Sequence, residues 1–252
     1  MDTTTMLFVF SVILFAGLMQ AITGFAYALV AIPLLIMVTS PREAVAIVLF
    51  TGVMMKTLLI YKTWQDGSFS YIMLIFCASV AGSLPGIYMM RLIDDSSLKI
   101  FISLALIVCV FAMGCNVKLT IRRHRLVQIL VGLTSGFLGA TAGFNGPPVI
   151  LYMMNENQGK VSMRANLVRY FLLGNLSTLF LSSAAGTLPL ESLLPYALIS
   201  IPAIVLAGWL GEKIFTCINP HIFRCIAMGT ICCSAIMTLF SALTPWLMNF
   251  WG

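Results

Sequence analysis

Charged residues are scarce in this sequence: Asp, Glu, Lys and Arg make up 9% of its 252 residues, while 60% are apolar. A soluble domain carries about 25% charged residues. Elements this apolar have no polar face to turn towards water, so the composition excludes a soluble enzyme, a nucleic-acid-binding domain and a secreted disulfide scaffold. The sequence predicts an all-α polytopic membrane protein, whose helix lengths are set by the bilayer.

Catalytic and metal-binding patterns are also missing. The eight acidic residues lie at the ends of apolar runs or in loops, which argues against a buried carboxylate relay for protons. The seven cysteines are scattered through apolar runs without a CxxC pair or metal-ligand spacing. We therefore expect no enzyme activity, no metal site and no cofactor. No basic residue precedes Arg42, so we expect no cleavable signal peptide.

Eight apolar runs are present, and six of them fit one membrane crossing of ~20 residues. The six runs cover residues 44–61, 69–90, 98–117, 165–185, 193–210 and 222–243. The first and fifth runs, 6–38 and 126–154, are too long for one crossing and are interrupted at Gly24 and at 143–148. Each of them therefore predicts a broken helix with a long arm and a short arm.

The interruptions belong to an internal repeat. Residues 22–26 (Ile-Thr-Gly-Phe-Ala) resemble residues 141–145 (Thr-Ala-Gly-Phe-Asn), and residues 81–84 (Ala-Gly-Ser-Leu) resemble residues 207–210 (Ala-Gly-Trp-Leu). Both pairs take matching places in the order of apolar runs. Construction from two repeated halves is the common plan of secondary transporters.

The distribution of Lys and Arg favours inverted repeats. The repeats would be residues 1–116 and 126–252, joined by a basic cytoplasmic linker at 117–125. If each broken run were one crossing, the fourteen basic residues would divide six to eight between the two sides. If each is a re-entrant hairpin followed by three transmembrane helices, they divide eleven to three, as the positive-inside rule expects. We therefore predict two inverted-topology repeats, with both termini on the non-cytoplasmic side.

The two breaks predict an anion site. Unwound backbone at membrane depth is costly unless it lines a cavity or binds a ligand. Gly24, Gly143 and Gly146 permit tight backbone, and Pro147 and Pro148 suit the first turn of a helix. We expect each short arm to begin at its break with free N–H groups and the positive end of its dipole facing the membrane centre. Two such helix N-termini would bind a small anion.

Side chains at and near the breaks are the candidates for substrate contact. Lys56 and Arg169 lie inside apolar runs, where each either snorkels to the interface or draws anions towards the site. Asn175 either bonds another helix or touches the ligand. The predicted substrate-binding residues are Gln20, Thr23, Gly24, Phe25, Tyr27, Thr141, Gly143, Phe144, Asn145, Gly146, Arg169 and Asn175.

The two Gly-Phe breaks, with the arms that continue through residues 33–35 and 148–150, resemble the sulfite exporter TauE/SafE family. The resemblance covers nearly the whole chain, with one motif in each half. It implies a bacterial or archaeal inner-membrane carrier of small anions, typically sulfite, sulfonates or related sulfur-containing organic acids. The sequence departs from the glycine-richest form of the motif, because Ala26, Tyr27 and Ala28 replace small glycines.

The implied partners are the lipid bilayer and a small anionic substrate, without nucleic acid. A membrane potential that is negative inside favours the exit of an anion, at ~2.3 kcal/mol per charge per 100 mV, so we expect an exporter. The alternatives are a transporter of small carboxylates and a non-transporting membrane subunit. Gly82, Gly86, Gly208 and Gly211 allow close helix approach, either within one chain or between two.

Overall fold

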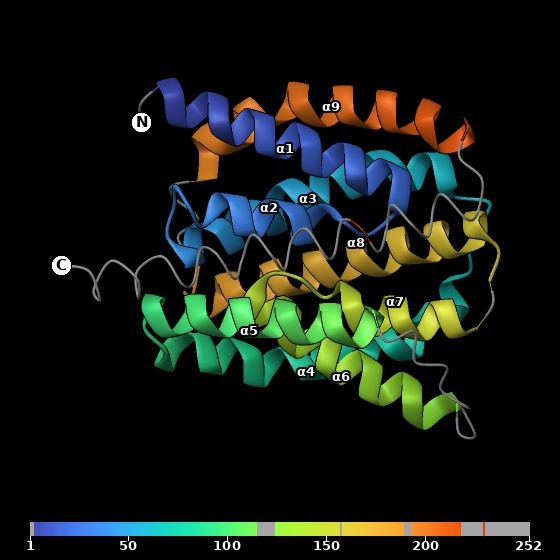
Figure 1. The fold of residues 1–252 in the computed structure, drawn as a ribbon. Coiled ribbons are helices and arrows are strands. Elements are labelled where there is room, and N and C mark those ends of the chain that lie inside the picture. The colour runs from blue at the N-terminus through green and yellow to red at the C-terminus, as the bar shows by residue number, and fades with distance from the viewer. Residues whose placement is uncertain (1–2, 115–123, 157, 189–192, 218–228, 230–252) are drawn as a thin grey trace.

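The computed structural model describes residues 3–114, 124–156, 158–188, 193–217 and 229. Every regular element in these ranges is an α-helix, which confirms the all-helical prediction for this part of the chain. The helices, shown in Figure 1, are α1 (Thr3–Thr23), α2 (Tyr27–Leu35), α3 (Pro41–Thr63), α4 (Phe69–Leu92), α5 (Asp95–Gly114), α6 (His124–Ala142), α7 (Gly146–Asn155), α8 (Lys160–Ala184) and α9 (Leu193–Cys217). The helix predicted within 222–243, and almost all of the linker predicted at 117–125, lie outside the described residues.

Six helices in the described ranges are long and apolar enough to cross a membrane: α1, α3, α4, α6, α8 and α9. At ~1.5 Å per residue, the 21 residues of α1 extend about 31 Å, close to the ~30 Å of a hydrocarbon core. The 9 residues of α2 and the 10 residues of α7 are too short to cross by themselves. The chain is therefore a multi-pass membrane protein that also contains two short helices.

Each short helix follows a three-residue break in a long helix. The backbone turns at Gly24 (φ 86°) and at Gly143 (φ 72°), a left-handed conformation that glycine adopts without the steric cost of a Cβ. Beyond the turns, α2 packs beside α1 and α7 packs beside α6 (Figure 1). Both interruptions thus fall at the glycines from which they were predicted.

A single sequence offset relates the first part of the chain to the second. The two turning glycines are 119 positions apart (143 minus 24). The same offset leads from the start of α2 to the start of α7 (146 minus 27) and from the start of α3 to the start of α8 (160 minus 41). The two parts of the chain pack against each other through three helix pairs, which Figure 1 shows: α4 with α6, α9 with α1, and α3 with α8.

Glycines permit the close approach of these helix pairs. A Cβ on Gly82 of α4 would lie 2.1 Å from the carbonyl oxygen of Leu133 in α6. In the other pair, a Cβ on Gly211 of α9 would lie 2.3 Å from Cβ of Ala21 in α1. Small residues allow membrane helices to pack backbone against backbone in this way. Both of these glycines therefore permit close packing between helices of the same chain.

Candidate functional site

The first break satisfies its own backbone donors. The Thr23 hydroxyl accepts from the N–H groups of Phe25 (3.3 Å) and Ala26 (3.1 Å). The Gln20 carboxamide accepts from the N–H of Tyr27 (3.1 Å) and donates to the carbonyl of the turning glycine (2.7 Å). The expectation of free N–H groups at this break is therefore wrong for these three donors. Thr23 and Gln20 stabilise the turn, and the bonds leave little of their polar surface for a ligand.

The second break has no such side-chain cap. Asn145 is the N-cap residue of α7, and its side chain makes no capping hydrogen bond. Applying the 119-residue offset to Gln20 and Thr23 leads to Gly139 and Ala142, which have no polar group to supply. Asn145 is only 8% exposed, so its amide lies in the protein interior with hydrogen-bonding capacity to spare. The two breaks match in backbone shape and differ in chemistry.

The other predicted residues around the second break contribute shape more than polar contacts. The Thr141 hydroxyl donates to the carbonyl of Phe137 in its own helix (2.8 Å). Phe144 is fully buried, as is its counterpart Phe25 in the first break. A Cβ on Gly146 would lie 3.1 Å from the side chain of Ile150. These positions define the walls of the break.

A lysine lies in the interior beside the start of α2. Lys56 is 3% exposed, and its Nζ donates to the carbonyl of Gly52, one turn earlier in α3 (3.3 Å). The ammonium lies 5.5 Å from the ring centre of Tyr27. The Asn175 amide oxygen accepts from it at 3.1 Å when the amide is oriented to satisfy both of its ends. Because the side chain turns towards the middle of α3, the snorkelling interpretation is wrong for Lys56.

Lys56 and Asn175 occupy matching positions along the sequence. They are 119 residues apart (175 minus 56), the offset that relates the two breaks. The contact between α3 and α8 therefore brings together matching residues that differ in charge. The sequence held a sufficient signal for this pairing, which is the offset between the two Gly-Phe motifs, but the pairing was not predicted.

No carboxylate balances the lysine in the part of the chain that the structure describes. The ion pairs found there join Arg42 to Asp95, His124 to Glu156 and Arg164 to Glu212. Residues 218–252 contain no Asp or Glu. A buried cation without a counter-ion is costly in a protein interior, so this position favours an anion.

Arg169 lies apart from this cluster. Its guanidinium donates to the carbonyl of Trp64 and to that of Ala165 (3.3 Å), and it lies 5.2 Å from the ring centre of Phe69. Six residues separate it from Asn175, which is about 9 Å along a helix. In this structure Arg169 ties α8 to the connection between α3 and α4, and it does not join the other candidates.

A second buried arginine on α8 has an acidic partner that the sequence did not reveal. Arg164, with 2% of its side chain exposed, donates to both Glu212 oxygens (2.8 and 3.2 Å). We expect Glu212→Gln to lower the free energy of unfolding by about 3 kcal/mol, because it leaves the arginine unpaired. Thermal unfolding in detergent measures the effect.

The matched control for Glu212→Gln is Glu156→Gln. It removes a 3.2 Å contact with His124, whose side chain is 60% exposed. Pairs this accessible to solvent contribute ~0–1 kcal/mol. An equal fall in the free energy of unfolding in the two variants would show that the buried Arg164 pair stabilises the protein no more than the exposed pair does.

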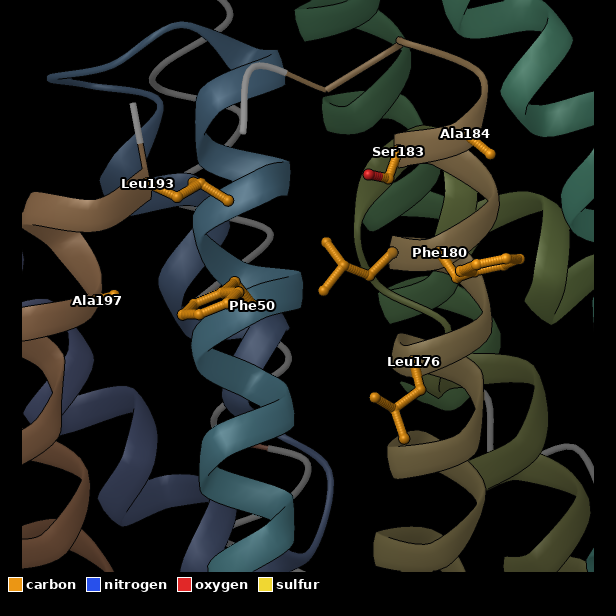
Figure 2. Close-up of a pocket in the computed structure, with 8 residues that line it drawn as sticks. Phe50, Leu176, Phe180, Ser183, Ala184, Leu193 and Ala197 are labelled. Carbon is orange, nitrogen blue, oxygen red and sulfur yellow. The ribbon is translucent and has the colours of Figure 1, made fainter. Parts of the chain in front are cut away.

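An apolar pocket of about 680 Å³ lies between α3, α8 and α9. Figure 2 shows its two walls, with Phe50, Leu193 and Ala197 on one side and Leu176, Phe180, Ser183 and Ala184 on the other. Ser183 is the one polar side chain in this lining. The pocket suits a hydrocarbon chain. It does not suit a small anion, because its lining has no charged side chain and a single hydroxyl.

The fold and the cluster around Lys56 define a class: a helical, multi-pass membrane protein with a cation in its interior. The chain belongs to the sulfite exporter TauE/SafE family, whose model matches residues 9–238. This match confirms the resemblance seen in the sequence and makes the protein a member of a family of anion exporters of the membrane. No curated protein and no solved structure matches the chain.

Proposed function

We propose that the protein is a bacterial inner-membrane exporter of a small sulfur-containing anion: sulfite, a sulfonate or a sulfur-containing carboxylate. The anion would bind at the membrane midplane, between the starts of α2 and α7. The observation that carries this proposal is the buried ammonium of Lys56, which has an amide and a ring beside it and, among the described residues, no carboxylate. An anion is the partner that such a cation lacks.

The proposed architecture is two inverted repeats, residues 1–116 and 126–252, each a re-entrant hairpin followed by three transmembrane helices. Three-residue connections between helices that pack side by side support a reversal of the chain at each break. An odd number of crossings after each hairpin would invert the second repeat, and the common offset of 119 residues supports equivalence of the two. Matching residues that touch, as Lys56 and Asn175 do, would lie near the axis relating inverted repeats, which passes through the midplane.

The proposed site extends from one break to the other. Tyr27, the first residue of α2, lies beside Lys56, and the Asn175 amide also contacts the ammonium. The residue before Asn175 in α8, Gly174, lies close to the second break, since an added Cβ there would lie 2.7 Å from Nδ2 of Asn145. The N-terminal ends of α2 and α7 would add favourable dipoles for an anion. Within this proposal, Gln20 and Thr23 hold the first turn in shape, and Arg169 holds the connection after α3.

Anion flux into proteoliposomes tests the function directly. The panel contains sulfite, a short sulfonate, a sulfur-containing carboxylate and a plain carboxylate. Gly143→Ala should disturb the second break, because residue 143 has a positive φ and an added Cβ would lie 2.7 Å from Ile32. Flux that is selective for a sulfur anion and is lost in this variant would support both the substrate and the site. Flux of plain carboxylates alone would overturn the substrate assignment. Absence of flux for every anion would overturn the transport function and favour a non-transporting subunit.

The spacing around Lys56 yields a local prediction for Gly52. A Cβ at this position would lie 2.8 Å from the Asn175 amide and 3.0 Å from Nζ of Lys56. Both are ends of flexible side chains that can move aside, so Gly52→Ala should fold normally and transport about tenfold more slowly. Flux and thermal unfolding measure the two effects. The control is Gly159→Ala, since nothing lies within 4 Å of a Cβ there; equal flux in the two variants would contradict a tight site.

A further inference from the structure

We infer that the central site selects monovalent anions, with one negative charge per bound substrate. The inference deepens the proposed function and rests on it. Its basis is the number of fixed charges that the fold places around Lys56. That number bears on the valence of the substrate, whatever the chemical group that carries the charge.

Among the residues that the structure describes, the helices around Lys56 contribute no second charge close to it. The short helices that start at the two breaks, α2 and α7, contain no acidic or basic residue. On α3 the other charged residues lie in the first and last turns: Arg42, Glu43 and Lys62. The position equivalent to Lys56 in the second half is held by a neutral amide, that of Asn175.

The two buried arginines of α8 are engaged elsewhere. Arg164 is neutralised by Glu212, with contacts of 2.8 and 3.2 Å. Arg169 donates to backbone carbonyls and lies between aromatic rings at the connection after α3. The described part of the chain therefore offers the site a single free positive charge, that of Lys56.

Charge balance at Lys56 then favours an anion with one negative charge. Lys56 is 3% exposed, so a charge left without a partner there is penalised far more than at the surface. A monovalent anion makes the loaded site neutral. A divalent anion leaves one negative charge uncompensated at the membrane centre, where charged groups are costly. Amide and backbone dipoles lower this cost and do not cancel a full charge.

The first experiment compares anions that differ in charge and share a one-carbon core. Purified protein in proteoliposomes is offered methanesulfonate (one charge) or methanedisulfonate (two charges), and acetate or malonate as a second pair. We expect the monovalent member of each transported pair to move at least about tenfold faster. Sulfite provides an independent measurement, because lowering the pH converts the divalent form to bisulfite and should raise flux.

The second experiment adds a positive charge at the equivalent position. Asn175→Lys places a second ammonium beside Lys56 and should reverse the preference within a pair, so that methanedisulfonate moves faster than methanesulfonate. Asn175→Gln, which stays neutral, is the matched control and should keep the monovalent preference. If the lysine variant fails to fold, the comparison of anions on the unmodified protein still decides the question.

The outcomes separate this inference from the proposed function. Equal flux of monovalent and divalent anions, with both lost in Gly143→Ala, would overturn the valence selection and leave the transporter assignment standing. Unchanged preference in a folded Asn175→Lys protein would also overturn it. Absence of flux for every anion would overturn the proposed function, and the inference with it.

Discussion

Replacing Lys56 with glutamine should reduce anion flux about a hundredfold and leave the protein at least as stable as the unmodified chain. Removing one partner of a buried charge pair costs ~2–5 kcal/mol of binding, and here the other partner is the proposed substrate. Stability should move in the opposite direction, because the empty protein no longer buries a cation without a counter-ion. Flux in proteoliposomes and thermal unfolding in detergent measure the two quantities.

The matched control for Lys56→Gln is Lys62→Gln. Lys62 lies in the last turn of the same helix and is exposed, so its loss should change neither flux nor stability appreciably. Lys56→Arg keeps the charge and should retain part of the flux. A fall in stability of Lys56→Gln together with unchanged flux would mean that the lysine is a structural contact and that the proposed site lies elsewhere.

The largest expected loss of stability comes from one methyl group at Gly136 in α6. A Cβ there would lie 1.8 Å from the carbonyl oxygen of Ser79 in α4, and 2.6 Å from its carbonyl carbon. These are backbone atoms of a packed helix, so no side chain can move aside and the two helices must separate. We expect Gly136→Ala to cost about 3 kcal/mol or more.

Thermal unfolding in detergent measures the effect of Gly136→Ala. The control is Gly159→Ala, which adds the same methyl group where nothing lies within 4 Å. Flux of the Gly136→Ala protein should fall with its folded fraction and recover at lower temperature. An unfolding midpoint equal to that of the control would show that the α4–α6 contact is looser than the structure has it.

The glycines show which features of the fold could be predicted from the sequence. Gly24 and Gly143 were predicted as breaks because a repeated Gly-Phe motif interrupted runs too long for one crossing, and both residues have positive φ. Gly52 was missed, because its role depends on Lys56 and on Asn175, which is over a hundred residues away. Conformational freedom is a local property of glycine, whereas the room it leaves for distant side chains belongs to the assembled fold.

The polar candidate residues also show which roles can be predicted from the sequence and which depend on the packing of helices. The amides and hydroxyls at the first break were predicted as ligand contacts, and the structure instead pairs those of Gln20 and Thr23 with the turn. Sequence alone could not distinguish the two roles, since the same groups serve either. Arg164 and Glu212 are 48 residues apart and are joined only because α8 and α9 meet. Such contacts follow from packing, which no short pattern encodes.

From the sequence alone one could predict the membrane location, the positions of most described helices, the two breaks and the family. These properties follow from apolar run length, glycine and repetition, each of which acts within a few residues. The contact between Lys56 and Asn175, and the separate position of Arg169, became apparent once the helices were assembled. A cation's partners depend on which helices pack together, and helix packing is set by residues across the whole chain.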